Sequence, residues 1–118
     1  MTNMCRLRKR KEIMKLSEAI REGAKLRPQC FGTPFNVGSC ALGAAYEATY
    51  KETTFSKLLC KEYPLLIKEI KVPKILQNCY PRTSQVCISS LIANLNDQVR
   101  WSREKIADWV EKIEKKHE

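Results

Sequence analysis

The sequence predicts an all-α (mainly α) protein, a compact single-domain bundle of about five to six short helices. The chain has 118 residues, enough for one hydrophobic core. It is 43% hydrophobic and 30% charged, as folded domains are. Its apolar residues recur mainly three and four positions apart, between segments marked by Pro and Gly. We expect a basic N-terminal arm at residues 1–11, either extended or continuing the first helix, and a helical domain at residues 12–118.

The first helix is expected over residues 12–26. Its apolar positions follow helical spacing: Ile13, Leu16, Ile20, Gly23 and Ala24. On the opposite face, Glu18 is expected to pair with Arg21, and Glu22 with Lys25. Pro28 ends the helix, because the residue before a proline is disfavoured in the α conformation.

A loop and a helix of small residues come next. Residues 28–38 contain two Pro and two Gly, which is typical of a structured loop. Ser39 is expected to cap a helix over residues 40–50 that is rich in Ala. Gly43 costs about 1 kcal/mol of helix propensity relative to Ala. We therefore expect a close crossing there, against Gly23 of the first helix.

The middle of the chain carries the weakest pattern. A short helix is expected over residues 55–63. Residues 64–71 are expected to form another, but the alternation of Ile70 and Val72 also fits a strand, so minor strand pairing around residues 66–72 stays open. An irregular connection follows.

Two helices complete the predicted bundle as a helical hairpin. The first spans residues 85–95, capped by Ser84 or Thr83, and the pair Asn96 and Asp97 ends it.

The last helix has the clearest local signals in the chain. Ser102 is its expected N-cap, and Trp101 before it can pack against Ile106 as a hydrophobic staple. Too few residues follow this helix to provide a recognition helix for DNA.

The net charge of +9 is unevenly distributed. Residues 1–27 hold nine basic and three acidic side chains, and residues 51–84 hold seven and three, whereas residues 85–118 balance at six and six. The expected nucleic-acid-binding residues lie on the arm and the first helix: Arg6, Arg8, Lys9, Arg10, Lys11 and Lys15. Such a cluster releases counterions from a phosphate backbone or meets an anionic protein surface, and the alternative is a solvated tail.

The cysteines predict reduced thiols rather than a disulfide framework. No apolar run resembles a secretory signal or a membrane span, so we expect a cytoplasmic protein without a membrane partner. The six cysteines lack the close pairs of a zinc site, and we predict no metal and no cofactor. Cys79 and Cys87 are the best metal candidates among them.

No catalytic residue is predicted. Cys40 opens a helix, where the N–H groups lower the pKa of a thiol, but a nucleophile also needs a base. The one histidine, His117, lies at the C-terminal end. We therefore interpret Cys40 as a buried, close-packed residue and keep a thiol-dependent enzyme as a minor alternative.

Three stretches carry a family resemblance: LSEAIREGAKLRPQ, SCALGAAYEA and LNDQVRWSREKIADWVE. Together they cover about a third of the chain, and they resemble a group of small uncharacterised bacterial and phage proteins. In that group the middle region often carries a cysteine pair near a proline, whereas this chain has Cys79 before Pro81 without a close second cysteine. The resemblance implies a similar fold, a phage or prophage origin and no particular activity.

These observations together predict a non-enzymatic intracellular accessory protein that binds a macromolecule. Nucleic acid and an anionic protein surface are both candidate partners for the arm. The alternative is a protein-interaction module without a nucleic-acid role.

Overall fold

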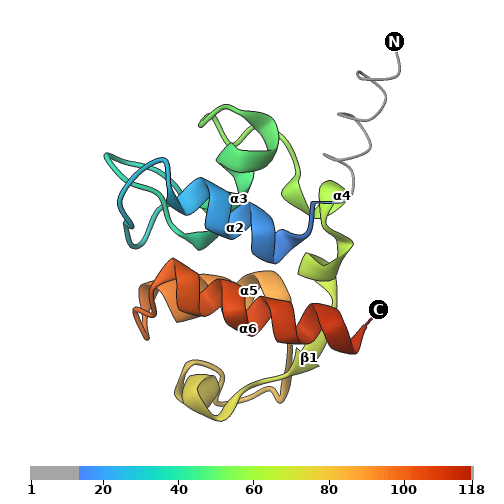
Figure 1. The fold of residues 1–118 in the computed structure, drawn as a ribbon. Coiled ribbons are helices and arrows are strands. Elements are labelled where there is room, and N and C mark those ends of the chain that lie inside the picture. Colours follow the sequence, from blue (N-terminus) through green and yellow to red (C-terminus); the bar gives the residue numbers. More distant parts are fainter. Residues whose placement is uncertain (1–13, 118) are drawn as a thin grey trace.

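The computed structural model describes residues 14–117 and is mainly α-helical, as predicted. The four longer helices are α2 (Leu16–Ala24), α3 (Ala41–Tyr50), α5 (Ile88–Asp97) and α6 (Arg103–Lys116). Helix α2 packs against both α3 and α6, and α5 lies below it beside α6 (Figure 1). The short elements are α4 (Leu59–Glu62), the 3-10 helices η1 (Pro64–Ile67) and η2 (Lys74–Cys79), and the strands β1 (Glu69–Lys71) and β2 (Gln85–Cys87).

Helix α2 is amphipathic, as its spacing predicts. Leu16, Ala19 and Ile20 are buried, together with Gly23. The expected pair of Glu22 and Lys25 forms at 2.9 Å and is exposed. The expected pair of Glu18 and Arg21 is wrong. The Glu18 carboxylate instead accepts a hydrogen bond from the backbone N–H of Lys15 at 2.7 Å, where the first turn of a helix has unpaired N–H groups.

The close approach of α2 and α3 is confirmed, but Gly43 does not make it. A Cβ atom on Gly23 would lie 1.8 Å from the carbonyl oxygen of Ala44, so only glycine fits there. Gly43 faces the preceding loop instead, where a Cβ atom would lie 2.3 Å from the carbonyl oxygen of Pro34. The two glycines therefore allow α3 to pack closely against α2 on one side and against the preceding loop on the other.

Helix α3 begins one residue later than expected. Cys40, not Ser39, is its N-cap, and the Cys40 Sγ accepts a hydrogen bond from the Gly43 N–H at 3.3 Å. Ser39 is held by the loop, since its backbone N–H donates to the carbonyl of Pro28 and its carbonyl accepts from Cys30.

The helix expected over residues 55–63 is mostly absent, and only α4 forms. Phe55 has a φ of 55°, a left-handed conformation that no α-helix contains. Its ring packs instead against those of Tyr46 and Phe35, with centroids 4.6 and 6.1 Å away. The packing of these aromatic rings therefore takes the place of the helix that was expected to begin at Phe55.

The helix expected over residues 64–71 is wrong beyond Ile67, and the strand pairing kept open around residues 66–72 forms instead. Only the 3-10 helix η1 forms at Pro64, and β1 follows it. Strand β1 pairs antiparallel with β2, with Ile70 opposite Val86 and Lys71 opposite Gln85. The 3-10 helix η2 lies in the connection that was expected to be irregular.

Helix α5 begins and ends later than predicted. Residues 85–87 form the strand β2, which pairs with β1, so the helix cannot begin before residue 88. Cys87 is therefore the N-cap, and not Ser84 or Thr83 as expected. At the other end, Asn96 and Asp97 continue the helix instead of ending it.

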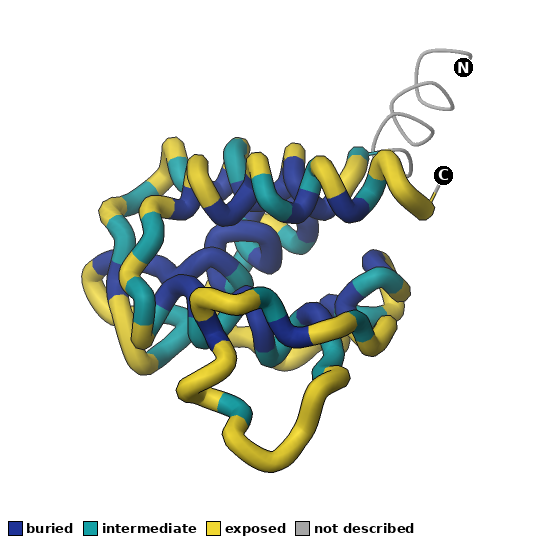
Figure 2. Tube along the Cα trace, turned by 90° about the horizontal axis from the view of Figure 1, so that it is seen from below, coloured by how far each residue is buried: buried dark blue, intermediate teal, exposed yellow. Residues whose placement is uncertain are grey.

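Helix α6 has the predicted cap and forms the lower layer with α5. The Ser102 Oγ accepts a hydrogen bond from the backbone N–H of Lys105 at 3.1 Å. Trp101 packs against the core, and the Lys105 ammonium lies 4.5 Å from the centre of its ring. Figure 2 shows the helix that leads to the C-terminus, with its buried side turned toward the other elements and its exposed side outward. No helix within residues 14–117 is long and apolar enough to cross a bilayer.

Candidate functional site

The predicted binding residues fall mainly where the structure gives no description. Arg6, Arg8, Lys9, Arg10 and Lys11 lie outside residues 14–117. Lys15 is exposed and directly precedes α2. The arm therefore remains a prediction, and the described residues give independent information about the charge of the domain.

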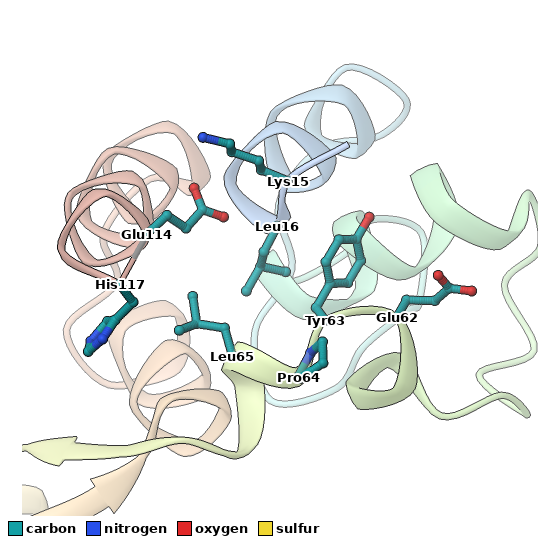
Figure 3. A pocket seen from close by; sticks show the side chains of 8 residues that line it. All are labelled: Lys15, Leu16, Glu62, Tyr63, Pro64, Leu65, Glu114 and His117. Carbon is teal, nitrogen blue, oxygen red and sulfur yellow. The ribbon is translucent and has the colours of Figure 1, made fainter. Parts of the chain in front are cut away.

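Lys15 borders a notch with a volume of about 260 Å³ between the start of α2, η1 and the end of α6 (Figure 3). The other lining residues are Leu16, Glu62, Tyr63, Pro64, Leu65, Glu114 and His117. Two of its polar groups already have partners in the fold. Glu114 accepts hydrogen bonds from the backbone N–H and the hydroxyl of Ser17 at 3.1 and 2.6 Å. The Tyr63 hydroxyl lies 3.0 Å from that of Thr49, and burial raises the pKa of Tyr63. The notch is mainly apolar.

The carboxylates of α6 gather around one arginine. Arg21 of α2 bonds Glu104 at 3.0 Å and both Asp108 and Glu111 at 2.7 Å. This arrangement lowers the pKa of Glu111. From the sequence, Asp108 and Glu111 are expected to be solvated charges among basic neighbours on an exposed helix face. Asp108 is exposed, and the packing of α2 on α6 adds Arg21 as a direct partner of both.

Arg27 and Glu47 form a second ion pair between the loop and α3. The two side chains meet through two bonds of 2.7 and 2.8 Å. The guanidinium of Arg27 lowers the pKa of Glu47. Both ion pairs join elements of the fold.

A buried arginine without a carboxylate partner joins α6 to α2. Arg103 donates to the carbonyl oxygens of Ala24 and Arg27, at 3.3 and 2.7 Å, and to the Ser39 hydroxyl at 2.9 Å. It also donates to the Ser39 carbonyl oxygen at 3.3 Å. Desolvation lowers the pKa of Arg103. Because these acceptors satisfy the guanidinium within the fold, we assign Arg103 a structural role that the sequence did not indicate.

The cysteine candidates are dispersed. Cys40 is buried, and desolvation raises the pKa of its thiol, although the sequence places it where a helix lowers the pKa of a thiol. Cys79 is exposed and Cys87 is half-buried, and both are free thiols. Within residues 14–117 no three His, Cys, Asp or Glu side chains form a metal-binding group.

Within residues 14–117, a group of exposed basic side chains without an ion pair lies close together in the sequence. We name this group the 61–82 surface, and its residues are Lys61, Lys68, Lys71, Lys74 and Arg82. All five are exposed, and none forms an ion pair with another described residue. The sequence indicated this excess through the charge of residues 51–84, but it did not single out these side chains. Three lysines of α6 are likewise exposed and without an ion pair to any described residue: Lys105, Lys112 and Lys116.

A hollow with a volume of about 270 Å³ lies within the 61–82 surface, between β1, η2 and the start of β2. Its lining residues are Lys71, Val72, Gln77, Tyr80, Pro81, Thr83 and Ser84. The Tyr80 hydroxyl is held by α5, 2.6 Å from both the Ser90 hydroxyl and the Asn94 amide nitrogen. The sequence gave no signal for this hollow, which depends on the pairing of β1 with β2.

Comparisons with known proteins add no relative, since no family model, curated protein or solved structure matches the chain. The resemblance of three stretches to small bacterial and phage proteins therefore stays a prediction.

Proposed function

We propose that this protein is a non-enzymatic nucleic-acid-binding protein that contacts the phosphate backbone. The predicted arm, with Lys15, and the 61–82 surface supply the positive charge. The observation that carries the proposal is that residues 61–82 hold five exposed basic groups without carboxylate partners among the described residues, against two acidic residues, whereas the unpaired lysines of α6 share their helix with four carboxylates.

The distribution of the acidic side chains supports this proposal. The carboxylates paired with basic groups are Glu22, Glu47, Glu52, Glu104, Asp108 and Glu111. Glu18, Asp97 and Glu114 accept hydrogen bonds from N–H or hydroxyl groups. Near the 61–82 surface, Glu62 and Glu69 remain to oppose five basic groups. Phosphates would thus meet a positive potential that the protein does not neutralise itself.

An anionic protein is the competing partner, and salt dependence separates the two. Nucleic-acid binding by phosphate contacts weakens steeply with salt, because each contact releases condensed counterions. A protein interface built on exposed apolar groups responds weakly to salt. A thiol-dependent enzyme is disfavoured by the buried Cys40, whose thiol has a raised pKa.

The test is an electrophoretic shift series with DNA and RNA fragments at several salt concentrations, using the full-length chain and a chain without residues 1–11. We expect binding by both proteins and a smaller slope of log affinity against log salt after the deletion. The slope should fall by about 0.7 to 0.9 for each lost phosphate contact. Absence of any shift at low salt with either nucleic acid would refute the proposal.

A further inference from the structure

Building on the proposed function, we propose that the hollow beside Tyr80 receives an unstacked base, so that the preferred ligand is single-stranded nucleic acid. Val72, Tyr80 and Pro81 supply apolar walls, and Gln77, Thr83 and Ser84 supply polar groups. A site that binds a nucleobase combines an aromatic or apolar wall with a few hydrogen-bonding groups.

Tyr80 is held in place by its hydroxyl. Because this group bonds Ser90 and Asn94 of α5 and the side chain packs partly against the core, a ligand in the hollow would reach Tyr80 through the part of its ring that stays exposed. Fixing the ring in advance reduces the conformational entropy lost on binding. Aromatic rings stack on every base, so this contact is tolerant of sequence.

One basic side chain, Lys71, lines the hollow, and Arg82 lies in the sequence between the lining residues Pro81 and Thr83. Lys74 and Gln77 are three residues apart in the 3-10 helix η2, where such residues share a face, so Lys74 is on the side of η2 that lines the hollow. No acidic residue lines the hollow, and Glu69 lies two residues before Lys71 on β1. A phosphate next to a bound base would therefore meet the positive charge of Lys71.

The size of the hollow also favours this ligand. A volume of about 270 Å³ is just below the usual range for small-molecule sites, roughly 300 to 1,000 Å³, so the hollow suits a small group such as a single base. A base inside a duplex is stacked and paired, and removing it costs free energy that a single strand does not require. Recognition of one base therefore selects for single strands.

The test measures the anisotropy of a dye-labelled oligothymidylate and of a duplex with the same number of phosphates, with wild-type protein and two variants. Tyr80→Leu removes the ring, and Tyr80→Phe keeps the ring and loses the hydroxyl. We expect wild-type protein to bind the single strand more tightly than the duplex. Tyr80→Leu should weaken single-strand binding about tenfold, and Tyr80→Phe by about twofold or less.

A second measurement uses wild-type protein and does not depend on the folding of a variant. An oligonucleotide with 5-iodouracil is photocrosslinked to the protein, and the adduct is mapped by mass spectrometry after trypsin digestion. We expect the adduct on Tyr80, in the peptide of residues 75–82. Adducts confined to other peptides would overturn the inference.

The outcomes distinguish this inference from the proposed function. Equal affinity for single strand and duplex, with no effect of Tyr80→Leu, would overturn the base-binding hollow and leave phosphate binding standing. Absence of binding to either probe at low salt would overturn both.

Discussion

The replacement Gly23→Ala should destabilise the fold, because the contact between α2 and α3 leaves no room for a methyl group. The new Cβ atom would lie 1.8 Å from the carbonyl oxygen of Ala44 and 2.7 Å from its Cα atom. Both atoms belong to the backbone of α3, so relief requires movement of a whole helix. Overpacking of this kind costs about 1–3 kcal/mol, and the rigid neighbour favours the upper end of that range.

Helix propensity opposes this loss. Alanine is better than glycine inside a helix by about 1 kcal/mol, so the expected net loss in the free energy of unfolding is about 2 kcal/mol. For a chain of this size the melting temperature should fall by roughly 8 °C. The control is Glu22→Ala on the exposed face of the same helix, which should change stability by about 0.5 kcal/mol or less.

Urea unfolding followed by circular dichroism measures both variants. For Gly23→Ala the urea concentration at the midpoint should fall. The slope of the free energy of unfolding against urea concentration should stay the same, because unfolding exposes the same surface. A midpoint equal to or above that of the unmodified protein would refute the packing of α2 on Ala44, because propensity alone would then decide the outcome.

Three further predictions follow from buried and paired groups. Arg103→Leu should lower the free energy of unfolding by about 3 kcal/mol or more, because it leaves buried acceptors without a donor; an unchanged urea midpoint would contradict the structural role. Acidification from pH 5 to pH 3 should lower the free energy of unfolding. The folded protein holds the pKa of Glu47 below its ordinary value, so the ionised carboxylate stabilises the fold at pH values above the ordinary pKa. This stabilisation is lost as the pH falls through the lowered pKa and the carboxylate is protonated. Arg27→Met should make this loss smaller in urea titrations at each pH. With iodoacetamide at neutral pH, exposed Cys79 should react faster than buried Cys40, and preferential labelling of Cys40 would instead support thiol chemistry.

The sequence predicted α2 and α6 correctly as helices, because capping residues and apolar spacing within each segment indicate them. The cap at Ser102 involves a backbone N–H three residues away, and α6 forms as expected. The apolar spacing of α2 likewise identified its buried face. Phe55 shows the opposite case, because its left-handed backbone lies in a loop whose aromatic contacts reach Phe35, twenty positions earlier in the chain.

The candidate site was predictable in charge but not in shape. The excess of basic residues in 51–84 can be counted from the sequence alone. The hollow needs Lys71 of β1 beside the connection that contains Tyr80, and the pairing of β1 with β2 closes that connection back onto β1. The strand over residues 85–87 was predicted as the start of a helix, so the sequence could not place the hollow.

The measurement that tests the account most directly compares two variants with the same net charge. One variant carries Lys71→Gln, Lys74→Gln and Arg82→Gln on the 61–82 surface, and the other carries Lys105→Gln, Lys112→Gln and Lys116→Gln on α6. Affinity for an oligothymidylate is measured by anisotropy between 50 and 200 mM salt. We predict a clear loss of affinity and a smaller salt slope for the first variant, with little change for the second. Equal losses in the two variants would show that net charge alone attracts the nucleic acid, and would contradict a site on the 61–82 surface.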